Sequence, residues 1–361
     1  MTDWLYPLLR CPACRGGLAF KAFDASNAQG LLAHDRTGCH ELYPVIDGVP
    51  RILVGAARAE LARTRGEWFG AYPEAARLGE RWETVAVADP VIASFDYEWR
   101  RFRDVGTADQ SKVFSLYFDL MPSTFFSSSH TVLDAGSGAG RWAFEVARRG
   151  PRVIAVDLGR SIELTRANTP PDRVACLQAD LRALPLASGA VDWAYSLGVL
   201  HHTDAPDVGL ENIVRSVRAG GVVLLYLYYA LDQRGPLFRA IFQAVDLTRR
   251  FVSRQPRAVA RAIATVIAGS IYWPLARAAA LVEGVGAKGL AAKVPLSFYR
   301  HLSFDTMRND SLDRFGTSLE RRYTQNEMKA LMTHSGLVDV NLSKLPPYWH
   351  GIGSKPLPGA R

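Results

Sequence analysis

The stretch Val132-Leu133-Asp134-Ala135-Gly136-Ser137-Gly138-Ala139-Gly140-Arg141 decides the fold of this 361-residue chain. An apolar run ends in an acid, a glycine-rich turn follows, and an amphipathic helix is expected over residues 142–149. Glycines let the chain turn tightly and let a ligand approach the backbone, and the next helix begins with free N–H groups. A dinucleotide site has the spacing Gly-x-Gly-x-x-Gly, whereas Arg141 stands at the sixth position here. The turn alone therefore does not distinguish a ligand site from an ordinary strand-to-helix turn.

The residues on either side of this turn follow an alternating pattern of short apolar runs and helical segments. Runs that are nearly all apolar are typical of parallel strands with helices on both faces of the sheet. The sequence therefore predicts an α/β fold. The candidate strands are Thr131–Leu133, Val153–Val156, Val174–Leu177, Val191–Tyr195 and Val222–Tyr228.

Acids follow two of these candidate strands. Asp157 stands at the end of the second, where a carboxylate can accept both hydroxyls of a ribose. Asp180 follows the third, and the fourth ends in Ser196-Leu197. The alternative for both acids is capping of a helix N-terminus.

Taken together, these elements resemble the class I S-adenosylmethionine-dependent methyltransferases, in the type 11 or UbiE-like subgroup. The resemblance is close over residues 126–230 and loose over 320–361. It implies a seven-stranded Rossmann-like sheet and S-adenosylmethionine as the cofactor. The glycine turn would hold the methionine part, Asp157 the ribose and Asp180 the adenine, with Ser196 beside the sulfonium. The implied cofactor-binding residues are Asp134, Gly136, Ser137, Gly138, Gly140, Asp157, Leu158, Asp180, Leu181, Ser196 and Leu197.

Two adjacent histidines, His201 and His202, follow the fourth candidate strand. Methyl transfer needs alignment of the acceptor and exclusion of water, and a hydroxyl acceptor also benefits from a base. Histidine titrates near neutral pH, so either residue is a candidate catalytic base. The alternative is that the pair shapes the turn and packs on the cofactor. No Asn-Pro-Pro-Tyr or Asp-Pro-Pro-Tyr follows the strand, which argues against nucleobase and glutamine amino groups as acceptors.

The N-terminal residues 1–55 contain Cys11-Pro12-Ala13-Cys14 and then Gly38-Cys39-His40. They resemble the zinc-ribbon domain of methyltransferase-activator proteins, but Arg36 stands where that domain has a further cysteine. Tetrahedral zinc needs a fourth ligand, for which His34 and His40 are the nearby candidates. The expected metal ligands are Cys11, Cys14, Cys39 and His40, and the alternative is a β-fold that has lost its zinc. A redox pair fits less well, because no thioredoxin-like βαβ pattern surrounds the cysteines.

The formal net charge of +8 comes from one segment. Residues 231–300 contain eleven basic and three acidic residues, and the rest of the chain is balanced. Arginines alternate there with apolar residues between Arg249 and Val266. A helix of this kind could lie on an anionic membrane or cap a pocket for a phosphorylated or lipid-linked acceptor. The alternatives are a solvated face and, less favoured because aromatic residues are sparse, a nucleic-acid surface.

The chain is expected to divide into five parts with separate roles. These are a zinc-ribbon-like module (1–55), a helical extension (56–125), a cofactor-binding domain (126–230), a basic helical cap (231–320) and a C-terminal helix with strands (321–361). We expect methyl transfer to oxygen, carbon or nitrogen of a small-molecule or lipid-linked acceptor. A ribosomal or transfer RNA methyltransferase is the first alternative, and a non-catalytic partner-binding protein is the second.

The composition also limits the class of protein. With 48% hydrophobic and 22% charged residues, the chain can bury a core, which excludes a disordered or collagen-like protein. Its four cysteines suit a reducing compartment rather than a disulfide scaffold. The first residues lack the pattern of a secretory signal, and the uncharged apolar stretch Ala262–Ala276 is shorter than the roughly 20 residues of a membrane span. We therefore expect a cytoplasmic protein, with the inner face of the membrane as a peripheral location.

Overall fold

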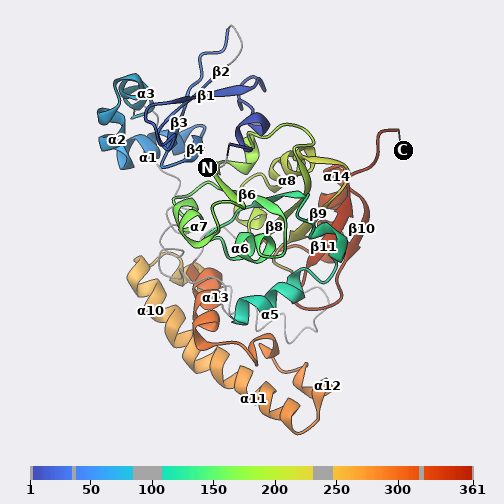
Figure 1. Cartoon of the computed structure of the whole chain (residues 1–361). Helices are drawn as coiled ribbons and strands as arrows, with labels where there is room; N and C mark the ends of the chain where they lie inside the picture. The colour runs from blue at the N-terminus through green and yellow to red at the C-terminus, as the bar shows by residue number, and fades with distance from the viewer. Residues whose placement is uncertain (1–2, 35–37, 84–107, 231–246, 317–320, 360–361) are drawn as a thin grey trace.

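The computed structural model describes residues 3–34, 38–83, 108–230, 247–316 and 321–359. Its centre is a mixed sheet in the order β7-β6-β5-β8-β9-β11-β10, in which β11 runs opposite to the other six strands (Figure 1). The predicted seven-stranded α/β sheet is thus confirmed. The strands are β5 (Thr131–Ala135), β6 (Arg152–Asp157), β7 (Val174–Ala179), β8 (Val191–Leu197), β9 (Val217–Tyr226), β10 (Val338–Leu342) and β11 (His350–Ser354).

Helices cover both faces of this sheet, so successive residues of each parallel strand are buried on opposite sides. Leu133 packs in the core under α8 and α14, whereas Val132 packs in the core under α5, α6 and α7. This explains why the strands are apolar throughout. The helices are α5 (Ala108–Tyr117), α6 (Arg141–Ala147), α7 (Ile162–Asn168), α8 (Pro206–Ser216) and α14 (Gln325–His334). Short 3-10 turns lie at Tyr6–Leu8, Ser123–Phe125, Leu181–Ala183, Leu200–His202 and Ser297–Tyr299.

The N-terminal residues form the expected β-rich module, which continues the central sheet. Its strands are β1 (Leu18–Ala22), β2 (Gly30–His34), β3 (Tyr43–Ile46) and β4 (Val49–Ile52). They pair antiparallel in sequence order, and β4 then pairs parallel with β7 through Arg51↔Gln178 and Ile52↔Ala179. The Arg51 side chain is buried and its Nη1 donates to Gln178 Oε1 at 2.8 Å. The module is therefore joined to the main sheet by both backbone and side-chain hydrogen bonds.

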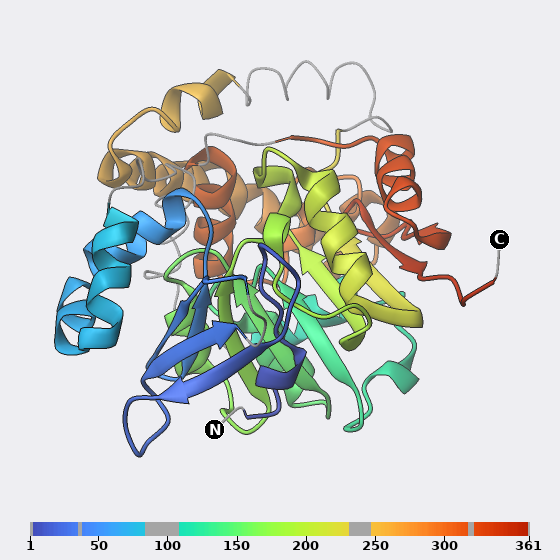
Figure 2. The ribbon, with the colours of Figure 1, turned by 90° about the horizontal axis from the view of Figure 1, so that it is seen from above.

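Three helices after this module, α1 (Ala56–Thr64), α2 (Gly66–Ala71) and α3 (Pro73–Glu83), share a hydrophobic core with it. Ile46 of β3, Leu61 of α1 and Trp82 of α3 are buried in this core. In Figure 2 the three helices lie at one end of the eleven-stranded sheet, beside β1 to β4. The aromatic run Phe95–Trp99, in which Tyr97 and Trp99 are candidates either for core packing or for closing the cofactor pocket, lies outside the described residues.

The described part of the basic segment and the residues after it, 247–316, is helical, and we call it the cap. Its helices are α10 (Arg257–Ile267), α11 (Trp273–Gly284), α12 (Lys288–Ala291) and α13 (Phe304–Gly316), and a π-helical turn (Ala268–Tyr272) joins α10 to α11 as one long helix. Figure 1 shows this long helix at the edge of the molecule, with α13 on its inner side. Ser311 Oγ of α13 donates to Ala264 O of α10 at 2.9 Å. Asp109 of α5 accepts from Ser303 N at 2.7 Å, which ties the cap to the central domain.

Candidate active site

A cavity of about 1160 Å³ lies between the carboxyl ends of the central strands and the cap. Loops after β5, β6, β7 and β8 form one wall. Residues of α5, of β9 and the loop after it, of the cap and of the C-terminal segment form the other. Most of the predicted cofactor-binding residues border this cavity. They are Gly136, Ser137, Gly138, Asp157, Leu158, Asp180, Leu181 and Leu197.

The turn after β5 needs glycine for two reasons: its backbone is left-handed, and a side chain at Gly136 would collide with a neighbour. Gly136 has a φ of 94°, and a Cβ added there would lie 2.3 Å from Val199 Cγ2. Gly140, with a φ of 86°, is the N-cap of α6. Other residues are strained in this left-handed region, so glycine lets the turn pass close to Val199 and enter the helix.

Asp157 connects this turn to the end of β6. Its Oδ2 accepts from Gly138 N, and its Oδ1 accepts from Gly159 N and from Ser161 Oγ, each at 2.9 Å. Burial raises the pKa of this carboxyl, and the hydrogen bonds oppose that shift. The carboxylate thus holds the glycine turn and the loop after β6 together, and it also lines the cavity itself.

Asp180 has a structural partner as well as a place at the cavity. It accepts from Arg182 N at 2.8 Å as the N-cap of the turn Leu181–Ala183, and its Oδ2 accepts from Arg182 Nη2 at 2.7 Å. Arg182 also bonds Asp204 and lines the cavity. Asp180 therefore caps this turn, as the alternative interpretation expected, and it also lines the cavity. Sequence reasoning missed Arg182, although an arginine two residues after a capping acid was visible.

Three of the predicted cofactor-binding residues, Asp134, Gly140 and Ser196, do not line the cavity. Asp134 and Ser196 are buried behind the glycine turn, and Ser196 Oγ donates to Ala135 O at 2.9 Å. Burial raises the pKa of Asp134 to about 8, and its Oδ2 has no hydrogen-bond partner among the described residues. Direct contact with the cofactor stays a prediction for these three residues.

Asp134 should make the stability of the protein depend on pH. Its folded-state pKa of about 8 lies above the roughly 3.9 of an unfolded aspartate. The folded state therefore favours the protonated form, and stability is lost as pH rises from about 4 through 8. We expect Asp134→Asn, which cannot ionise, to lose less stability over this range. Melting curves of both proteins at several pH values test this, and parallel curves would contradict it.

The two histidines have different surroundings. His201 is fully buried, does not line the cavity, and stacks on Tyr228 at 4.0 Å between ring centroids. Burial lowers its pKa well below the ordinary value, which keeps it neutral. His202 borders the cavity. Of the pair, only His202 lines the cavity, whereas His201 packs on Tyr228 inside the protein.

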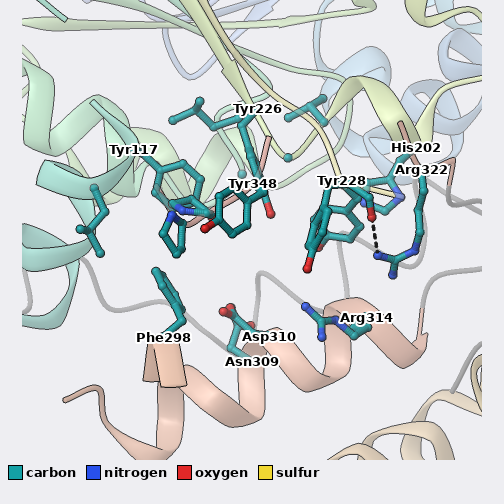
Figure 3. Close-up of a pocket in the computed structure, with 18 of the residues that line it drawn as sticks. Tyr117, His202, Tyr226, Tyr228, Phe298, Asn309, Asp310, Arg314, Arg322 and Tyr348 are labelled. Atoms are coloured by element: carbon teal, nitrogen blue, oxygen red, sulfur yellow. Dashed lines mark hydrogen bonds between the residues drawn. The ribbon is translucent and has the colours of Figure 1, made fainter. Parts of the chain in front are cut away.

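The opposite wall of the cavity is aromatic (Figure 3). Tyr117 of α5 packs edge-to-face on Tyr226 of β9 at 5.0 Å, and Tyr228, Phe298 and Tyr348 extend the wall. Charged side chains accompany these rings at the wall, namely Asp310, Arg314 and Arg322. Sequence reasoning missed this wall because its members come from distant segments, although the tyrosines after β9 were a visible signal.

A buried histidine supports the segment that carries Tyr348. The His350 side chain is fully buried, its Nδ1 donates to Pro347 O at 2.6 Å, and its Nε2 lies 2.6 Å from Asp119 Oδ1. Asp119 Oδ2 in turn accepts from Ser343 Oγ at 2.9 Å. Both ends of the segment between β10 and β11 are thereby held to the end of α5.

The N-terminal module brings Cys11, Cys14, Cys39 and His34 together, with their ligand atoms within 4.8 Å of one another. Cys14 Sγ lies 2.6 Å from His34 Nε2, and Cys11 Sγ lies 3.9 Å from Cys39 Sγ. Three thiols and an imidazole are a suitable donor set for tetrahedral zinc. In the described part of the chain the fourth member of this group is His34, and the predicted His40 does not belong to it.

Removal of one thiol should release a metal from this group. We expect Cys11→Ser to lower zinc content from about one per chain to near zero, because structural zinc needs four protein ligands. Elemental analysis of the purified protein measures this. His34→Ala should have the same effect, while His40→Ala should leave the zinc content unchanged. Loss of zinc only in the His40 variant would assign the fourth ligand to that residue instead.

Comparison with known proteins supports a methyltransferase fold for the centre of the chain. Residues 133–225 match a family described as a methyltransferase domain. Malonyl-[acyl-carrier protein] O-methyltransferase of Enterobacter lignolyticus is 32% identical over 34% of this chain and 49% of that protein. The UbiE ubiquinone/menaquinone biosynthesis C-methyltransferase of Syntrophotalea carbinolica is 30% identical over 26% of this chain and 42% of that protein. A solved complex of the Haloferax volcanii Trm112 methyltransferase activator with a methyltransferase aligns with a TM-score of 0.40 and 14% identity, over 75% of this chain and 100% of that one.

The chain thus spans less than half the length of these two curated relatives. The family match includes the glycine turn, Asp157 and Asp180. Residues 133–225 match the methyltransferase-domain family, and the N-terminal module and the cap lie outside the matched residues.

Proposed function

We propose that the chain is an S-adenosylmethionine-dependent methyltransferase for a small-molecule or lipid-linked acceptor. One observation carries this proposal: a single cavity joins the loops after β5 to β8 to an aromatic wall. One side of the cavity suits the cofactor and the other suits an apolar or planar acceptor. The methyltransferase family match over residues 133–225 supports the assignment of the first side.

The residues of the first wall have the chemistry to hold the cofactor. The glycine turn allows a ligand close to its backbone, and Asp157 can accept hydrogen bonds from ribose hydroxyls. Leu158 and Leu181 provide apolar contacts beside Asp157 and Asp180 at the cavity. The cofactor, when bound, would supply an electrophilic methyl carbon, which an acceptor atom could attack in line as the bond to sulfur breaks and S-adenosylhomocysteine leaves.

The residues of the second wall would align the acceptor and exclude water. Tyr117, Tyr226 and Tyr228 offer flat apolar surfaces, and loss of water favours transfer from a sulfonium because positive charge disappears in the step. His202 is the base for a hydroxyl acceptor in this proposal, since it borders the cavity. An acceptor that needs no proton removal would use the same wall without it.

Binding and transfer test this proposal separately. S-adenosylhomocysteine should raise the melting temperature, because a ligand that binds only the folded state stabilises it. A labelled methyl group from S-adenosylmethionine should then enter the organic-soluble or small polar fraction of a host extract. Label in RNA would replace the proposal with an RNA methyltransferase. No thermal shift and no label would favour the non-catalytic alternative.

A further inference from the structure

The long helix α10–α11 exposes an apolar surface. Val266 and Leu281 of this helix are 66% and 73% exposed, and Val285, directly after it, is 83% exposed. Val259, Ile271 and Trp273 of the helix are exposed as well. We call these six residues the outer face. A surface helix of a soluble protein normally directs charged residues to water. Here the exposed residues between 258 and 287 are apolar, small or hydroxyl-bearing.

The three charged side chains described within this range, Arg261, Arg277 and Glu283, are half-buried. Arg277 donates to the carbonyl oxygens of Arg300 and Leu302 at 2.9 and 2.7 Å. Glu283 is bound by Arg300 and His301. Two of the three are therefore held on the inner side, and the outer face has no charge that would oppose burial in an apolar medium.

Positive charge lies at both ends of the outer face. Arg250 and Arg254 precede it, Lys288 and Lys293 follow it, and all four are exposed. Glu283 is the one acid between residues 247 and 293, and its charge is already paired with Arg300. An apolar helix face with basic ends is complementary to an anionic lipid surface, where the apolar residues enter the interface and the basic ones meet headgroups.

The inner side of the same helix argues against a transmembrane span. The segment Ala258–Gly284 is long and apolar enough to span a bilayer by length and composition. Its inner alanines, Ala264 and Ala276, are nevertheless buried in the protein, and Ala264 O accepts from Ser311 of α13. A helix with one side packed on the domain can offer only its other side to lipid.

The cavity reaches the surface at this helix. Ile271 belongs to the outer face and also lines the cavity, as does the exposed Lys293. We propose that the outer face docks on an anionic phospholipid surface and that the cavity takes a lipid-linked acceptor from it. The second half of this inference rests on the proposed methyltransferase function, and the first half does not.

Vesicle binding of the full chain tests the docking surface. The probes are vesicles of phosphatidylcholine alone and of phosphatidylcholine with phosphatidylglycerol, and flotation measures the bound fraction. We expect binding to the anionic vesicles that weakens with salt. The double variant Val266→Glu/Leu281→Glu should lower the partition coefficient at least about tenfold, because two apolar contacts are lost. Val208→Glu, an exposed valine on α8, is the matched control and should bind like the unchanged protein.

Absence of vesicle binding, or equal binding by the double variant, would overturn the docking surface. So would a dimer in solution that the double variant dissociates, because a second copy would then cover the outer face. A thermal shift with S-adenosylhomocysteine on the same preparations separates the two proposals. A shift without vesicle binding refutes the docking alone, and vesicle binding without a shift refutes the methyltransferase. Label that enters aqueous but not lipid fractions would overturn the lipid-linked acceptor.

Discussion

Replacement of Asp157 by alanine is expected to lower the affinity for S-adenosylhomocysteine at least about 100-fold. The change removes the acceptor for ribose hydroxyls and also the acceptor of the hydrogen bonds from Gly138 N and Gly159 N. The glycine turn then loses its connection to the end of β6, so the remaining contacts are displaced as well. Titration calorimetry with S-adenosylhomocysteine measures the loss.

Asp192→Ala provides the control for this experiment. Asp192 also accepts from a backbone amide, Thr131 N at 2.8 Å, and from Arg218 Nε at 2.9 Å, but it does not line the cavity. We expect this variant to lose stability, because a backbone donor loses its partner, while its affinity for the ligand stays within about twofold. Equal affinities of the Asp157 and Asp192 variants would remove Asp157 from the cofactor site.

Gly136→Ala should have the second largest effect. A Cβ at this position would lie 2.3 Å and 2.6 Å from the two methyl carbons of Val199, and the φ of 94° disfavours any side chain. Left-handed backbone costs about 1–2 kcal/mol and overpacking costs about 1–3 kcal/mol more. Because Val199 also lines the cavity, the displacement should change the cofactor wall. We expect a lower melting temperature and no thermal shift with S-adenosylhomocysteine.

The control for the glycine substitution is Gly336→Ala, beyond the end of α14. Gly336 has a φ of 91°, and a Cβ there would have no described atom within 4 Å. The two variants thus share the backbone strain and differ in the contact with Val199. Gly336→Ala should lower the melting temperature and keep the thermal shift. A retained shift in Gly136→Ala would show that the turn tolerates a side chain and would contradict the assigned role.

Local sequence was sufficient for the central sheet. Its parallel strands are apolar because both faces are covered, so β5 to β8 each begin within one residue of the expected start. The helix expected within residues 321–361 is α14, where Thr324 and Glu327 form a capping box that marks the start in sequence as well. Strands and helix starts that depend on neighbouring residues can therefore be predicted from the sequence alone.

Contacts between segments that are distant in the sequence could not be predicted in the same way. The aromatic wall combines α5, β9, the cap and the segment before β11, and no local pattern joins them. The order of residues also does not show which side of a turn faces the cavity, so Asp134 and Ser196 were expected at the ligand. His34 and His40 were both near in sequence to the cysteines, and the register of β2 with β3 decides between them.

The pairing of β4 with β7 has a consequence for solubility. Every residue of β7 is buried, so without the N-terminal module this strand would end the sheet with unpaired backbone groups and an apolar surface beside them. Open edges of this kind pair with strands of other molecules and start aggregation. The module thus covers the end of this edge strand, at Gln178 and Ala179, and we expect the central domain expressed without it to aggregate more readily.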